Sequence, residues 1–221
     1  EDILMGLRIK FLEAIRLDSE KAYEFSFKTA VVDEKAILRK DTANEKIEVN
    51  WDLVDQEAMD VATHSEMITD DYFTSTNKKA KQTIAESFAE QRSIPKTVEA
   101  LRSVLNQETW KLERLARTNI INASNEGRLA GYQKVSTTRQ QLYDKGKITK
   151  KPKEDKYTLI VAFGSRTCDA HRRLASAIPA GGLPLDELKE LQNSIGSQFG
   201  MRLSGNSLLH ANQRTVISRV V

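Results

Sequence analysis

Residues 115–132 read Leu-Ala-Arg-Thr-Asn-Ile-Ile-Asn-Ala-Ser-Asn-Glu-Gly-Arg-Leu-Ala-Gly-Tyr and lie inside the longest helical pattern of the chain. Small or apolar residues recur in this pattern at steps of three and four, which places them on one helix face: Ala116, Ile120, Ala123, Gly127 and Ala130. Such small side chains let a neighbouring helix or sheet approach closely. We therefore predict a long central helix over about residues 107–135 that packs on another element through this face.

The residues before the central helix also read as helices. Apolar spacing predicts them over four stretches: 3–17, a less clearly phased one from residue 18, 52–73, and 75–91. The turn-like Thr74-Ser-Thr-Asn77 separates the last two. Tyr23–Phe27 alternates apolar and polar residues, which leaves a strand open there. Ser93 as N-cap and Pro95 in the first turn mark the start of the next helix.

The residues after the central helix change in character. Tyr157–Phe163 reads as a strand, and the Val/Ile-rich Thr215–Val221 is a candidate to pair with it. Short helices are expected over Asp169–Ala177 and Leu185–Ile195. The predicted fold class is therefore α+β and predominantly α-helical, with a long central helix packed on a small C-terminal β-sheet and an N-terminal helical region. We divide the chain into residues 1–92, an N-terminal helical region for docking, and residues 93–221.

Composition narrows the class of protein. Hydrophobic residues make up 39% of the chain and charged residues 29%. No apolar run approaches the ~20 residues that span a bilayer, so a transmembrane protein is not expected. The first residues lack a basic region followed by an apolar core, so we expect no signal peptide. A single cysteine, Cys168, excludes an internal disulfide.

The charges are divided unevenly along the chain. Residues 1–100 carry 14 Lys/Arg against 21 Asp/Glu, whereas residues 101–221 carry 20 against 10. A basic C-terminal half indicates an acidic partner such as nucleic acid. Attraction between the two halves of the chain would produce the same pattern, so both interpretations stay open.

Two groups of residues are candidates for chemistry. Cys168, His171 and His210 include a Cys-x-x-His spacing, which is typical of one half of a zinc site or of a cysteine nucleophile with its base. The alternative is a buried thiol beside a hydrogen-bonded turn histidine. No phosphate-loop, dinucleotide, serine-hydrolase or zincin motif occurs. We therefore expect no enzymatic activity, no cofactor and no bound metal.

The second group is a lysine-rich loop over residues 144–156, flanked by Tyr143 and Tyr157. Exposed lysines bind nucleic-acid phosphates without reading sequence, although a lysine-rich loop is also commonly just solvated. The candidate DNA contacts are Lys145, Lys147, Lys150, Lys151, Lys153 and Lys156.

The stretch 115–132 resembles the signature helix of the phage head morphogenesis family, the Mu F-like minor head proteins. The matching positions are Arg117, Thr118, Asn125, Gly127, Arg128 and Tyr132. The segment 163–174, with Arg166-Thr-Cys168 and His171, resembles the strand and turn that follow in that family. Residues 210–215 stand where some members have a Cys-bearing box, with Gln213 and Thr215 in place of both cysteines.

This resemblance implies a minor capsid protein of a tailed bacteriophage, located inside the head near the portal vertex and in the host cytoplasm during assembly. Its expected partners are the portal protein, the major capsid or scaffolding protein, and double-stranded DNA; no membrane partner is expected. We expect Arg117, Asn125 and Arg128 to hold the central helix against the Arg166–His171 turn. The alternatives are a portal-docking protein without DNA contact, and a metal-dependent or cysteine hydrolase centred on Cys168, His171 and His210.

Overall fold

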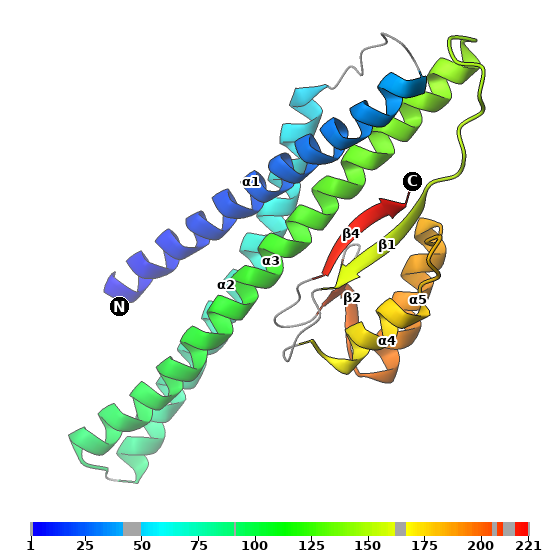
Figure 1. Ribbon diagram of the computed structural model, residues 1–221. Helices are drawn as coiled ribbons and strands as arrows, with labels where there is room; N and C mark the ends of the chain where they lie inside the picture. Colours follow the sequence, from blue (N-terminus) through cyan, green and yellow to red (C-terminus); the bar gives the residue numbers. More distant parts are fainter. Residues whose placement is uncertain are drawn as a thin grey trace.

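Three long helices form most of the molecule: α1 (Asp2–Asp41), α2 (Trp51–Ala89) and α3 (Ile94–Asp144). They run up, down and up, so α1 and α3 are parallel and α2 is antiparallel to both (Figure 1). The predicted fold class, α+β and predominantly helical, is confirmed. The computed structural model describes residues 2–41, 50–90, 92–161, 167–204, 207–209 and 215–220.

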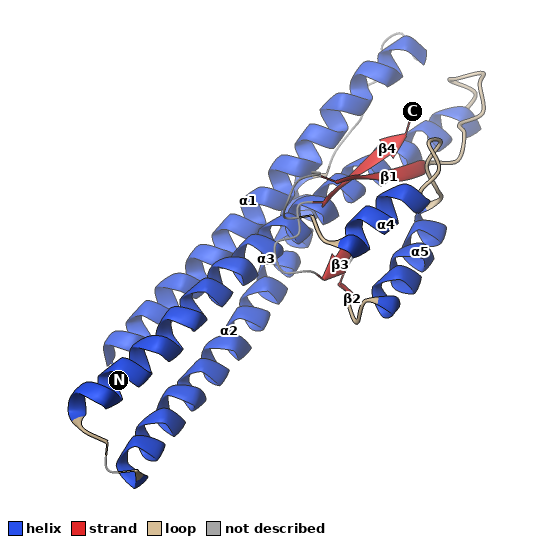
Figure 2. Ribbon diagram, turned by 60° about the horizontal axis from the view of Figure 1, so that its bottom comes forward, coloured by secondary structure: helices blue, strands red, loops and turns tan. Residues whose placement is uncertain are grey.

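A smaller unit of strands and short helices lies along one side of α3 (Figure 2). In chain order its elements are β1 (Lys156–Val161), α4 (Asp169–Ala177), α5 (Leu185–Gln198), β2 (Arg202–Ser204), β3 (Ser207–Leu209) and β4 (Thr215–Val220). β1 and β4 pair antiparallel, with Leu159 opposite Ile217, and β2 pairs with β3. The predicted pairing of the two longer strands is confirmed, and α4 has the predicted bounds.

Three predictions for the first hundred residues are wrong. The two helices expected over 3–17 and from residue 18 are one, because α1 is continuous from Asp2 to Asp41. The break expected at Thr74–Asn77 does not occur, because α2 runs through it and the Thr76 hydroxyl donates to the Tyr72 carbonyl at 3.0 Å. Such hydroxyl bonds to the preceding turn let a helix carry threonine. The strand left open at Tyr23–Phe27 is helix: both of these residues are buried, whereas Phe25 is 69% exposed. The helical spacing therefore determines this segment.

The helix start predicted at Ser93 and Pro95 is confirmed, although the capping differs and this helix is continuous with the predicted central one. α3 begins at Ile94 with Pro95 in its first turn, but the Ser93 side chain makes no capping hydrogen bond. The Ser93 carbonyl accepts the first backbone hydrogen bond of the helix, from the Thr97 N–H at 3.0 Å. The helix extends well beyond 107–135 at both ends.

The helix α3 joins two hydrophobic clusters. One cluster lies inside the bundle and combines α1, α2 and α3, with Tyr23, Phe27, Val54 and Ala123 among its members. The other combines α3 with the smaller unit, and its buried residues include Leu129, Tyr132, Tyr157, Leu174, Leu188 and Ile217. The boundary proposed at residue 92 coincides with the α2–α3 turn, while α3 itself shares a core with both parts.

None of the helices in the described part of the chain has an apolar stretch long enough to cross a membrane.

Candidate functional site

The motif residue Asn125 ties α3 to the small sheet. Its side chain is 1% exposed. Its Nδ2 donates to the Thr215 carbonyl at 3.0 Å, and its Oδ1 accepts from the Ile217 backbone N–H at 3.1 Å. One side-chain amide therefore satisfies an acceptor and a donor of β4, as a neighbouring strand would. We expected this contact at the Arg166–His171 turn, and the structure places it on β4 instead.

The motif residue Gly127 lets α1 and α3 touch backbone to backbone. A Cβ at Gly127 would overlap the carbonyl of Tyr23, and one at Gly131 would stand 2.8 Å from the carbonyl oxygen of Phe27. Near the same contact the hydroxyls of Ser26 of α1 and Ser124 of α3 are 2.7 Å apart and hydrogen-bonded. The close approach predicted from the small residues of this face is confirmed, and the neighbour is α1.

The remaining motif positions differ in burial. Thr118 is buried and donates to the Arg114 carbonyl at 2.8 Å. Arg117 is exposed, and Arg128 is half-buried, with an Nε that has no hydrogen-bond acceptor among the described residues. Arg166 lies outside the described residues, so its expected contact with the helix stays a prediction.

A neighbouring asparagine fixes α3 to α2. Asn119 is 3% exposed, and its Nδ2 lies 3.3 Å from both the Ser65 carbonyl oxygen and the Thr69 hydroxyl. Asn119 and Asn125 therefore bind α2 and β4, respectively.

The predicted thiol–imidazole pair is brought together. The Cys168 Sγ lies 3.1 Å from the His171 Nδ1, with Cys168 at the N-cap of α4 and His171 5% exposed. A thiol and an imidazole at this distance are two members of a nucleophilic constellation, which also needs donors for an oxyanion. His210, the third candidate, lies outside the described residues. Within the described ranges, no three His, Cys, Asp or Glu side chains are grouped to hold a metal.

The lysine loop carries its charges outward. Each of the six candidate lysines is exposed. Two residues hold the loop against the rest of the molecule, Asp155 and the buried Ile148. Asp155 accepts a hydrogen bond from Ser136 of α3 and forms an ion pair with Arg219 of β4 at 2.6 Å. These contacts fix the loop against α3 and β4, with its lysines on the surface.

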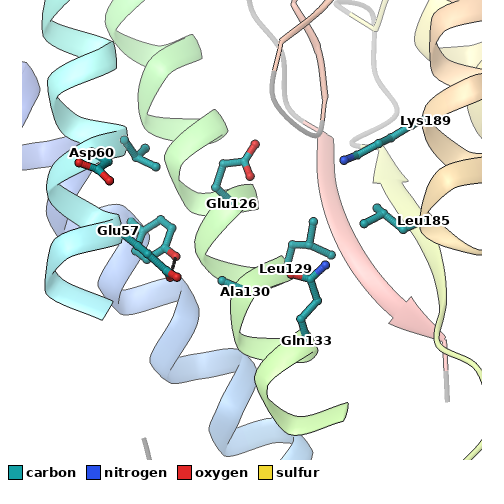
Figure 3. Close-up of a pocket in the computed structure, with 10 residues that line it drawn as sticks. Glu57, Asp60, Glu126, Leu129, Ala130, Gln133, Leu185 and Lys189 are labelled. Carbon is teal, nitrogen blue, oxygen red and sulfur yellow. Dashed lines mark hydrogen bonds between the residues drawn. The ribbon is translucent and has the colours of Figure 1, made fainter. Parts of the chain in front are cut away.

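A pocket of about 430 Å³ lies between the bundle and α5 (Figure 3). Its bundle side carries three carboxylates, Glu57, Asp60 and Glu126, and Lys189 points toward them from α5. The Tyr23 hydroxyl donates to Glu57 at 2.6 Å. Burial, and then the bond to Glu57, raise the pKa of Tyr23 well above its usual range. No local sequence pattern indicates this pocket, because its residues come from four separate helices.

No protein-family model matches the chain, and comparisons with curated proteins and with solved structures give no match either.

Proposed function

We propose that this chain is a non-enzymatic minor head protein of a tailed bacteriophage, which associates with the portal vertex inside the head and contacts DNA without sequence preference. The proposal is carried by the structural contacts of the residues that resemble the head morphogenesis motif. Asn125 binds β4, Gly127 admits α1, and Thr118 is buried. The motif residues therefore hold the bundle and the sheet together. Such a role is expected of residues that maintain a family's fold, rather than of residues that catalyse a reaction.

The surfaces of the molecule favour binding over catalysis. The lysine loop presents six exposed lysines between the end of α3 and the start of β1. Two carboxylates of the pocket, Glu57 and Asp60, belong to α2, in the part of the chain with excess acidic residues. A polyanion is attracted to the loop and repelled from these carboxylates, so DNA and a protein partner would contact different parts of the molecule.

Portal association is tested by co-purification of the chain with the portal protein, with the stoichiometry read by light scattering. The proposal expects a defined complex at low and moderate salt. Absence of any complex at either salt would contradict the portal role, whatever the outcome of a DNA-binding assay.

DNA contact is tested by the salt dependence of binding to a random-sequence duplex. Replacing Lys150 and Lys151 by glutamine should lower the slope of log K against log salt by about 2, since each phosphate contact contributes about 0.9. The matched control replaces Lys10 and Lys21, which are exposed on α1, and should leave the slope unchanged. Equal slopes for both variants would favour a portal-docking protein that does not touch DNA.

A further inference from the structure

The pocket of Figure 3 continues along α2 and α3 into a second pocket, and the two together are here called the α2–α3 groove. Glu57, Ala130 and Gln133 line both pockets, whose volumes are about 430 and 220 Å³. The lining residues lie between positions 50 and 61 on one wall and between 126 and 137 on the other. At 1.5 Å per residue each wall is about 16 Å long, which is about three helical turns.

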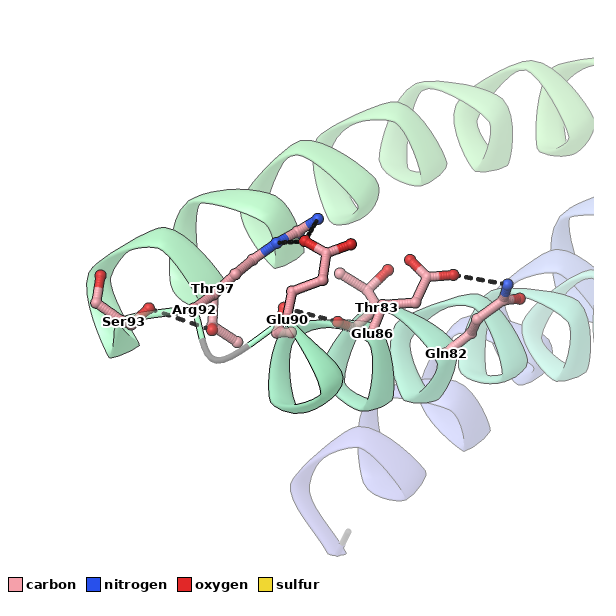
Figure 4. A network of polar contacts seen from close by, with 8 residues as sticks. Gln82, Thr83, Glu86, Glu90, Arg92, Ser93 and Thr97 are labelled. Carbon is pink, nitrogen blue, oxygen red and sulfur yellow. Dashed lines mark hydrogen bonds and ion pairs between the residues drawn. The ribbon is translucent and has the colours of Figure 1, made fainter.

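The two walls are fixed relative to each other away from the groove. At the α2–α3 turn, the Arg92 side chain donates to Glu90 at 2.6 Å (Figure 4), and its backbone N–H donates to the Ser87 carbonyl at 2.9 Å. Between this turn and the groove, Asn119 of α3 donates to the Ser65 carbonyl of α2 at 3.3 Å. The spacing of the two helices is therefore set by contacts that an occupant of the groove need not disturb.

The floor of the groove belongs to α1. Tyr23 lines the larger pocket and Phe27 the smaller one, and each is 3% exposed. The Tyr23 hydroxyl donates to Glu57 of α2 at 2.6 Å, and the Tyr23 carbonyl lies against Gly127 of α3. Because α1 contacts both walls in this way, the groove is preformed, and a partner pays little in reorganisation to enter it.

The two pockets differ in charge. The larger pocket is lined by three carboxylates, Glu57, Asp60 and Glu126, against one cation, Lys189. In the smaller pocket Glu57 is balanced by Lys134. The apolar side chains that line the smaller pocket are Phe27, Leu53, Val54 and Ala130. A complementary occupant therefore carries a cation at the larger pocket and an apolar side chain at the smaller one.

Apolar surface continues from the smaller pocket onto the outside of the bundle. Leu53 is 51% exposed and Trp51 is 44% exposed. The Trp51 ring stands edge-on to Phe27 with centroids 6.2 Å apart, and Lys28 lies over it at 5.4 Å. Tryptophan is enriched among the residues that dominate protein–protein binding. A small cation in the larger pocket would leave this surface uncovered, so the groove suits a macromolecule whose apolar end lies here.

The walls of the groove select a helical occupant. Backbone N–H and C=O groups within a helix bond to one another, so the walls offer few to an incoming chain. An extended occupant would bury its own backbone groups without partners, whereas a helix satisfies them internally. The α3 lining shifts by four residues, from 126–133 in the larger pocket to 130–137 in the smaller. Four residues are about one helical turn, so two side chains one turn apart reach both pockets.

We propose that the α2–α3 groove binds an amphipathic helix of a partner protein, which places an apolar side chain in the smaller pocket and a lysine or arginine, one turn away, in the larger pocket. This is the helix-in-groove mode of recognition, with the acidic residues of the groove setting the direction of the helix. The inference rests on the lining of the groove and does not depend on the proposed phage function.

The first experiment selects binders for the intact chain from a displayed library of helical peptides of about four turns with randomised outer positions. Enriched peptides should carry an apolar residue and a lysine or arginine one turn apart. Their affinity, measured by fluorescence anisotropy, should fall at least about tenfold with Asp60→Lys, because like charges then meet. Asp55→Lys is the matched control, since Asp55 is also an exposed aspartate of α2 but does not line the groove. Enrichment of no helical peptide, or equal weakening by both variants, would overturn the proposal.

The second experiment tests the smaller pocket with the same peptide. Leu53→Ser should weaken binding at least about fivefold, because apolar surface that the peptide covers is lost. Met59→Ser is the control, since Leu53 and Met59 are 51% and 53% exposed on the same helix and only Leu53 lines the groove. Equal losses for the two variants would place the peptide elsewhere and refute the assignment.

The third probe is cadaverine, a linear diamine that supplies a cation without a helix or an apolar side chain. It should bind at least about a hundredfold more weakly than the enriched peptide, because it leaves the smaller pocket and Trp51 uncovered. Cadaverine binding as tight as that of the peptide, and abolished by Asp60→Lys, would make the groove a site for small amines and overturn helix docking.

Discussion

Replacing Asn125 by alanine should destabilise the fold more than any other single change on the outer face of α3. The substitution removes the donor to the Thr215 carbonyl and the acceptor for the Ile217 N–H, which are 3.0 and 3.1 Å away. Both backbone groups would stay on the side of β4 that faces α3. The amide is 1% exposed, so water does not replace it without opening the interface.

The magnitude follows from the two groups left without partners. A buried donor or acceptor that loses its hydrogen bond costs about 1–3 kcal/mol, so the pair gives about 2–6 kcal/mol. Alanine has a better helix propensity than asparagine, which offsets less than about 1 kcal/mol of this loss in folding stability. Since whole domains are stable by about 5–15 kcal/mol, the loss should be large enough to detach the small unit from the bundle.

Urea unfolding followed by circular dichroism measures the loss, and amide exchange at Ile217 reports directly on the freed N–H. The matched control is Asn77→Ala, because Asn77 is an exposed asparagine within α2. The control should change stability by less than about 0.5 kcal/mol. A loss below about 1 kcal/mol for Asn125→Ala, with unchanged exchange at Ile217, would refute the assigned role.

Three further outcomes follow from the packing and charge of the same structure. Gly127→Ala should destabilise by at least about 1–3 kcal/mol in urea unfolding, because the new methyl meets the backbone of α1, whereas Gly181→Ala, with open space around it, should be neutral. Asp155→Asn should cost about 3 kcal/mol by leaving Arg219 without its carboxylate, and a thermal melt that matches the unaltered chain would contradict this. Tyr23 keeps its proton in the folded state above its usual pKa of about 10, so folding stability should fall as pH rises beyond that value, by up to about 1.4 kcal/mol per pH unit; Tyr23→Phe should remove this part of the slope.

The long helices and the main strand pairing were predictable because their signals are local and repeated. The spacing of small residues around Gly127 gives a close contact on that face whatever the neighbour is. Tyr157–Phe163 and Thr215–Val221 each carry the β-branched and aromatic residues that favour strands, and they are the longest such stretches after the central helix. Because a strand needs a partner for its backbone hydrogen bonds, pairing these two strands was the simplest expectation.

The rest depended on contacts between distant residues. The two helices predicted on either side of Thr74–Asn77 are one, because hydroxyls such as that of Thr76 bond to the preceding turn instead of ending the helix. Asn125 was recognised as important, but its partners lie 90 and 92 residues away, and no local pattern distinguishes β4 from the turn before α4. The acidic pocket likewise joins Glu57 to Lys189 across most of the chain.

The lysine loop and the acidic pocket give α3 a role beyond packing. The loop follows the end of this helix at Asp144, whereas Glu126 of the pocket lies well before that end. At 1.5 Å per residue, about 27 Å of helix separates this carboxylate from the first lysine of the loop. Beside Glu126, Gly127 packs on α1 and Asn125 bonds to β4, so the helix is fixed on two sides at the pocket. The same helix therefore keeps the lysines proposed to contact DNA away from carboxylates that would repel it.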